Sequence, residues 1–213
     1  MVISFPSTVV FVASNAAGSI MENWINYLTI TVLAATLFGL LLADSRRMII
    51  LAYCGVLLMI FTINIQFWTF GFSLSKLLTG IMAVVILALT PERKDLTQSG
   101  LSATGKVFGA VGLGFGIILT LFTINTTSDF LAITYDQVIP SLFVLFCGFI
   151  MLGISQESFR IIIGLLTLLA GFQILYGAVE QSLLINGLLA AVELLVALVG
   201  SYLLTPAMRE GEE

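Results

Sequence analysis

Residues 182–204 read SLLINGLLAAVELLVALVGSYLL, and this stretch decides the fold class. Its only ionisable side chain apart from Tyr202 is Glu193, and most of its other residues are Leu, Val or Ala. A helix needs about 20 mostly apolar residues to cross the hydrocarbon core of a bilayer. The stretch therefore predicts a membrane-spanning helix that carries one carboxyl group near its middle.

Six further segments of the same character precede this one. They lie at 25–43, 47–66, 70–90, 107–124, 138–154 and 158–179. Hydrophobic residues make up 59% of the 213-residue chain and charged residues 9%, whereas an average soluble protein carries about 25% charged residues. So few charges cannot cover a water-facing surface. The sequence predicts one all-α membrane domain, residues 1–213, with about seven transmembrane helices and the lipid bilayer around it.

Short polar stretches mark the ends of these segments. The predicted breaks are Asp44–Arg47, Phe70-Gly71, the linker 91–106, Asn125–Asp129, Ser155–Ser158 and Glu180–Ser182. Residues 1–24 are predicted to be extramembrane or interfacial, because Pro6 and the stretch Ser14–Gly18 would interrupt a spanning helix. Residues 205–213 form the predicted C-terminal tail.

The basic residues predict the orientation, since Lys and Arg collect in cytoplasmic loops. With the N-terminus outside the cell, the segments on the inner side hold Arg46, Arg47, Arg93, Lys94, Lys106, Arg160 and Arg209. The segments on the outer side then hold no basic residue. We therefore expect a cell inner (plasma) membrane protein with its N-terminus outside, a cytoplasmic linker at 91–106 and a cytoplasmic tail.

Two triplets of helices share features, which indicates an internal repeat. The triplets are 25–90 and 138–204, and the helix 107–124 links them. In each triplet an arginine precedes or begins the second helix, and Leu-Thr-Pro closes the third. These features are Arg46 and Arg160, and Leu89-Thr90-Pro91 and Leu204-Thr205-Pro206. Both triplets would have the same orientation, so the sequence predicts parallel repeats.

The composition excludes several classes of site. The chain has no histidine, and its two cysteines, Cys54 and Cys147, lie far apart in apolar runs. We therefore predict no metal site, no cofactor and no catalytic centre in this chain. Nucleic-acid binding is not expected, because no basic run is longer than two residues. Gly112 and Gly116 have the GxxxG spacing that suits close packing between membrane helices.

Two ionisable residues, Glu193 and Lys76, fall within predicted spans, on corresponding helices of the two triplets. A charge near the bilayer centre costs several kcal/mol, so such residues usually face protein or water and serve a function. Removal from water favours the uncharged form of either group, which makes both candidates for proton transfer. Four amides are candidate supporting partners: Gln173, Asn186, Asn64 and Gln66.

Structural explanations of these polar residues remain open at this stage. Lys76 and Glu193 could form a buried ion pair, or Lys76 could extend toward the membrane surface along its own helix. The four amides could serve only as hydrogen-bonding contacts between helices.

Residues 155–204 resemble the NuoK/MrpC family, the three-helix membrane subunits of respiratory complex I and of multisubunit cation/proton antiporters. The resemblance lies in Ile163-Gly164-Leu165, after a charged loop, and in Ala190-Ala191-Val192-Glu193. It implies that Glu193 is the membrane carboxylate of a proton path. The family has a second glutamate in its middle helix, whereas residues 164–169 are apolar here apart from Thr167.

The whole chain is similar in length and layout to HyfE-type subunits of group 4 hydrogenase and formate hydrogenlyase complexes. Ser155-Gln156, Arg160 and Lys76 support this resemblance. It implies a non-redox membrane-arm subunit of an oxidoreductase complex, packed against larger antiporter-like subunits. The alternatives are a purely structural scaffold subunit and a small autonomous ion-coupled transporter. Against a transporter, no Gly/Pro pair breaks the helices at their centres.

Overall fold

The computed structural model describes residues 28–43, 45–90, 103–131, 135–180 and 182–205. Nearly all of these residues are helical, and no strand occurs among them. Six helices are long and apolar enough to cross a membrane: α2 (Arg46–Phe67), α3 (Phe70–Leu89), α4 (Ala103–Leu131, with its apolar part at Val107–Ser128), α5 (Tyr135–Ile154), α6 (Ser158–Val179) and α7 (Leu183–Leu204). A shorter apolar helix, Leu28–Leu42, precedes α2. The chain is therefore an all-α, multi-pass membrane protein, as its composition predicts.

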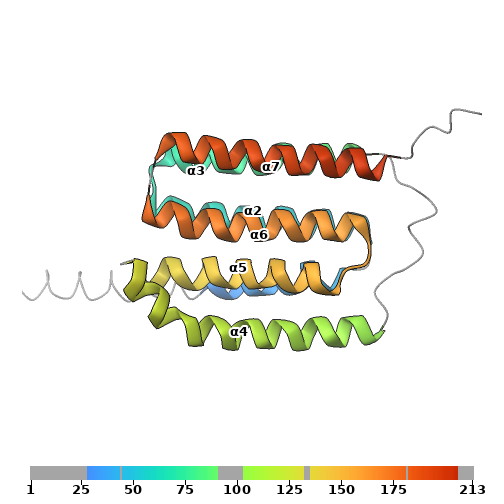
Figure 1. Ribbon diagram of the computed structural model, residues 1–213, viewed down its shortest axis with the longest axis horizontal. Helices are drawn as coiled ribbons and strands as arrows, with labels where there is room; N and C mark the ends of the chain where they lie inside the picture. Colours follow the sequence, from blue (N-terminus) through green and yellow to red (C-terminus); the bar gives the residue numbers. More distant parts are fainter. Residues whose placement is uncertain (1–27, 44, 91–102, 132–134, 181, 206–213) are drawn as a thin grey trace, which may run out of the picture.

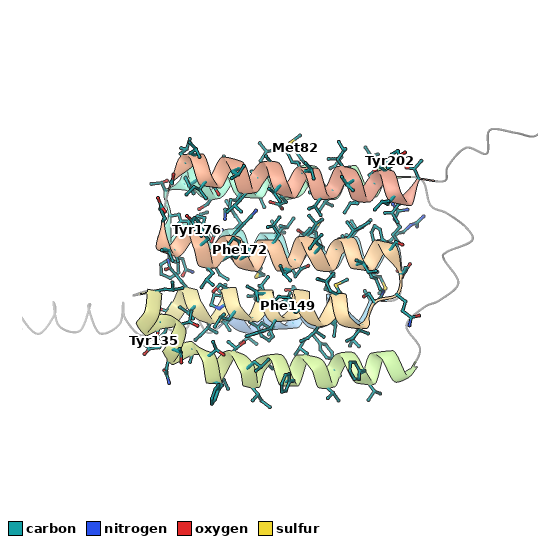
Figure 2. All side chains as sticks on the ribbon, viewed as in Figure 1. Met82, Tyr135, Phe149, Phe172, Tyr176 and Tyr202 are labelled. Carbon is teal, nitrogen blue, oxygen red and sulfur yellow. The ribbon has the colours of Figure 1, made fainter. Side chains whose placement is uncertain are left out.

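The exterior of the bundle suits lipid. Large apolar side chains project from it, and Met82 of α3 and Tyr202 of α7 stand out from its edge (Figure 2). Their exposed fractions are 50% and 80%. Because apolar side chains gain nothing from water, a surface of this kind is stable only when hydrocarbon covers it.

Three predicted breaks differ from the structure. The linker predicted over 91–106 ends earlier, because α4 already begins at Ala103. The turn between α2 and α3 lies at Trp68 and Thr69 rather than at Phe70-Gly71, which belong to α3. The Trp68 N–H donates to Asn64 O and so closes the last turn of α2. The polar stretch Asn125–Asp129 does not end α4, which continues to Leu131.

The reason for the longer α4 is local hydrogen bonding. Short polar side chains can bond to the backbone of their own helix instead of breaking it. The Ser128 hydroxyl donates to Asn125 O at 3.0 Å. The predictions for residues 1–24, for 91–102 within the linker and for 206–213 of the tail concern residues outside the described ranges.

The two triplets are stacked, with corresponding helices side by side. In Figure 1, α3 lies beside α7 and α2 lies beside α6. The chain passes through α2 and α6 in one direction and through α3 and α7 in the other. Parallel helices of the two triplets therefore face each other, and α4 packs at the edge of the bundle against α5.

The closest helix contact is between α5 and α6, and it depends on two glycines. A Cβ atom on Gly148 would lie 2.5 Å from Leu168 N, and one on Gly171 would lie 2.5 Å from Leu145 N. Gly112 and Gly116 of α4 lie against Ile150 of α5, where their Cβ atoms would meet its side chain at 2.9 and 3.2 Å. Small residues therefore bring α4, α5 and α6 together, which is common where membrane helices pack.

Arginines satisfy the carbonyl groups at the ends of two helices. Arg46 Nη2 donates to Leu87 O at 2.6 Å and to Thr90 O at 2.7 Å. At the corresponding place in the second triplet, Arg160 donates to the carbonyl oxygens of Leu41 and Ala43. The last carbonyls of a helix lack partners within it and attract positive charge. These four hydrogen bonds therefore tie the end of α3 to the start of α2, and the end of the helix Leu28–Leu42 to the start of α6.

Candidate functional site

A small cavity with several polar residues in a mostly apolar lining lies between α2, α3, α6 and α7. Its volume is about 20 Å³, which is room for about one water molecule. Four of its lining residues were predicted from the sequence as site residues, and each comes from a different helix: Asn64, Lys76, Gln173 and Glu193. The other lining residues are Leu57, Ile60, Phe61, Ser73, Leu77, Ala170 and Ile174. The stacked triplets thus bring four residues that are far apart in sequence to one place.

Glu193 lies deep in the bundle. It follows the first residue of α7, Leu183, by ten positions and precedes the last, Leu204, by eleven. At 1.5 Å per residue it is about 15 Å from either end of the helix. Only 3% of the residue is exposed. The carboxyl group is therefore at mid-depth and away from the lipid boundary.

One side chain donates a hydrogen bond to this carboxyl group. Gln173 Nε2 lies 3.3 Å from Glu193 Oε2. The same amide nitrogen lies 3.4 Å from Leu189 O, one turn earlier in α7. Because an amide nitrogen carries two hydrogens, it can serve both acceptors. Both contacts are long, so the hydrogen bonds by which Gln173 positions Glu193 are weak.

The ammonium group of Lys76 contacts the aromatic ring of Trp68. Its Nζ lies 4.7 Å from the centroid of the Trp68 ring, which is cation–π geometry. The indole ring lies over Gly177 of α6, where any Cβ atom would collide with it. Glycine at this position therefore makes room for the ring that contacts the lysine.

Lys76 and Glu193 face the same cavity without touching. Among the described residues, no nitrogen–oxygen contact within 4.0 Å joins the two. They are close enough to interact electrostatically. The pair is therefore separated across the cavity, and a direct buried ion pair is not what the structure shows.

Two of the predicted amides lie elsewhere. Gln66 is exposed, and Asn186 is half-buried near the start of α7; neither lines the cavity. Two buried polar residues were missed, Ser73 and Tyr53, and both are 0% exposed. Ser73 could have been found, because it precedes Lys76 by three positions and so shares its helix face. Tyr53 lies within electrostatic reach of Glu193.

The arrangement suits the transfer of a proton better than the binding of a metal. Among the residues that the structure describes, no group of three His, Cys, Asp or Glu side chains could hold a metal ion. The cavity has one carboxyl group, and an ammonium group faces it. A single carboxyl group next to water can take up and release a proton without further ligands.

Comparison of the chain with protein-family models, with curated proteins and with solved structures found no match. The geometry of the cavity is therefore the basis for inferring function, because function belongs to a site and not to a fold.

Proposed function

We propose that this chain is an ion-translocating membrane-arm subunit of a complex I-like or energy-converting hydrogenase-type complex. The observation that supports the proposal most is a lone carboxyl group at mid-depth that lines a water-sized cavity. Glu193 carries the proton, and Lys76 acts on it electrostatically across the cavity. The resemblance of 155–204 to the NuoK/MrpC family and of the whole chain to HyfE-type subunits agrees with this role.

The physical reason is the cost of charge inside a membrane. An ionised side chain at this depth is expensive, so Glu193 is stable there only with polar partners or water. Gln173 and the cavity supply such partners. Because Glu193 and Lys76 interact, proton binding at one changes the free energy of proton binding at the other. A charge that arrives from a neighbouring subunit can therefore load or unload Glu193.

The exposed surface of the bundle favours a subunit of a larger complex over an autonomous transporter. Large apolar side chains are exposed along α3 and α7 beside the cavity, among them Leu78 and Leu195. Such faces can pack against larger antiporter-like subunits or against lipid. In this proposal the partners perform the redox reaction, and this chain, in the inner membrane with its N-terminus outside and its C-terminus in the cytoplasm, has no catalytic centre of its own.

The test is the variant Glu193→Gln in the assembled complex. We expect proton pumping per redox turnover to fall by about tenfold or more, because an amide cannot take up a proton. Glu180→Gln is the matched control, since Glu180 is an exposed carboxyl group at the end of α6 and should leave pumping unchanged. Normal pumping by a fully assembled Glu193→Gln complex would leave this chain with a packing role only.

Purification separates the subunit from an autonomous transporter. A subunit should co-purify with large antiporter-like partners and show no transport alone. Transport by the isolated chain in liposomes would contradict the proposal.

A further inference from the structure

The polar groups of the cavity are arranged from one end of the bundle to its middle. Asn64 precedes the end of α2, Phe67, by three residues, and Ser73 follows the start of α3, Phe70, by three. Both are thus about 4–5 Å from the α2–α3 turn at 1.5 Å per residue. By the same measure Lys76 lies about 9 Å from that turn, and Glu193 about 15 Å from the α6–α7 turn at the same end.

Two polar atoms lie at the end of the cavity nearest these turns, which we call its entrance, and neither has a hydrogen-bond partner among the described residues. Asn64 Nδ2 and Ser73 Oγ make no hydrogen bond to any described residue, although the two residues are only 2% and 0% exposed. Both residues line the cavity. Buried polar atoms without a protein partner usually bond to ordered water. A space that can hold a water molecule and offers it several polar partners meets the conditions for binding one.

The other half of the bundle is closed by apolar packing. On the side of Glu193 away from these turns, three apolar residues are each 0% exposed: Ala83, Leu87 and Ala197. A Cβ atom on Gly200 would lie 2.8 Å from the Ile162 side chain, so α6 and α7 are in close contact there. In the same half the Thr167 hydroxyl donates to Ile163 O of its own helix, whereas the buried Tyr53 hydroxyl has no hydrogen-bond partner among the described residues. The cavity lining includes none of these residues.

We propose that a water molecule occupies this cavity and that Glu193 is reached from one face of the membrane only, the face at which the α2–α3 and α6–α7 turns lie. The unpartnered polar atoms of Asn64 and Ser73 bind this water near the turns, and Lys76 lies between them and Glu193 along the cavity. The proposal deepens the proposed function, on which it rests for the identity of the transported ion. A carrier open to one side must receive its proton from the other side through a partner or through a rearrangement of the apolar half.

The experiment measures the reactivity of single cysteines in the full chain within membrane vesicles. In a Cys54→Ala, Cys147→Ala background, Asn64→Cys and Ser73→Cys are treated with a small, charged, membrane-impermeant thiol reagent. Right-side-out and inverted vesicles are compared. The controls lie in the apolar half. Ala83→Cys is on α3, the helix that also carries Ser73, and Ala197→Cys is on α7, which packs against α3. Complete labelling after denaturation establishes that each cysteine is present and reduced.

We expect the entrance cysteines to react about tenfold or more faster than the controls, because thiol reactivity requires access of water and reagent. The reaction should occur in one vesicle orientation only. Rates at Asn64→Cys and Ser73→Cys as low as those of the controls would mean a dry cavity and overturn the proposal. Equal rates from both sides would overturn the one-sided access.

The pumping assay distinguishes this proposal from the proposed function. One-sided labelling together with normal pumping by Glu193→Gln would leave the water-filled entrance in place and remove the ion-carrying role. Loss of pumping in Glu193→Gln together with unreactive cysteines at the entrance would keep the ion-carrying role and remove the water-filled entrance. Ser73→Cys exchanges only oxygen for sulfur, so its labelling remains readable even if Asn64→Cys lowers the yield of folded protein.

Discussion

Glu193 owes its position to the balance between the cost of its burial and the polar groups around it. A carboxyl group without partners at this depth would destabilise the bundle by several kcal/mol. The amide of Gln173 at 3.3 Å offsets part of that cost. Glu193 also lines the cavity, where water can serve its carboxyl group. The same features that make the residue tolerable in the fold make it able to exchange a proton.

The contribution of Gln173 can be measured by a double-mutant cycle. Gln173→Leu should lower the free energy of unfolding by about 1–3 kcal/mol, because it leaves a buried carboxyl group without its donor. In a Glu193→Leu background the same change should cost about 0.5–3 kcal/mol less. Unfolding in detergent micelles, followed by circular dichroism, gives both values. The exposed Gln66→Leu is the control, with an expected change within about 0.5 kcal/mol. Equal costs in the two backgrounds would show that Gln173 does not act through Glu193.

The contact between α5 and α6 is the tightest of the bundle, and it holds the second triplet together next to the site. Gly148 and Gly171 let the two backbones approach so closely that a methyl group on either would reach main-chain atoms of the other helix. Main-chain atoms cannot move aside as the end of a side chain can, so the helices would have to separate. Because α6 carries Gln173, separation would also displace the donor to Glu193.

Alanine substitutions in α5 test this contact. Gly148→Ala should lower the free energy of unfolding by about 1–3 kcal/mol through overpacking. Gly153→Ala, in the same helix, has nothing within 4 Å of the new methyl group. It should be neutral or stabilising by up to about 1 kcal/mol, because alanine favours a helix over glycine. The measurement is thermal unfolding in detergent, and similar stabilities of the two variants would contradict close packing of α5 against α6 at Gly148.

The whole molecule creates a site that neither triplet has alone. Asn64 and Lys76 come from the first triplet, whereas Gln173 and Glu193 come from the second. Stacking in parallel places α3 against α7 along their length, and Thr90 Oγ1 meets Ser201 Oγ at 2.7 Å at the far end of this contact. One chain thus achieves a juxtaposition that two separate three-helix proteins would need an interface to form.

A designed disulfide tests the stacking directly. In a Cys54→Ala, Cys147→Ala background, Thr90→Cys with Ser201→Cys should form a disulfide on oxidation, because the two side chains already meet. A protease site inserted within residues 91–102 would cut the chain between the triplets. After cleavage the fragments should stay joined on a non-reducing gel and separate on a reducing gel. Ser75→Cys with Ser201→Cys is the control, since these residues lie near opposite ends of α3 and α7 and should not join. Failure of the first pair to join would exclude this arrangement of α3 and α7.

The sequence by itself determined that this protein is a helical membrane bundle, and nearly where its spans lie. The reason is that a bilayer admits few solutions: long apolar runs must become helices, because their backbone groups have no other partners in hydrocarbon. It also determined that Glu193 and Lys76 lie within spans, since their depth follows from counting residues along a helix.

The tertiary structure alone decided which polar residues meet. Asn64 and Gln66 are two positions apart in α2, which turns them by about 200° to nearly opposite faces; one lines the cavity and the other is exposed. In a soluble helix the apolar stripe would have shown which face is inward, but a membrane helix is apolar on all sides and conceals it. The sequence therefore predicted both Asn64 and Gln66 as supporting partners of the site, and it missed Tyr53. Only the packing of the four helices determines which face of each helix points inward.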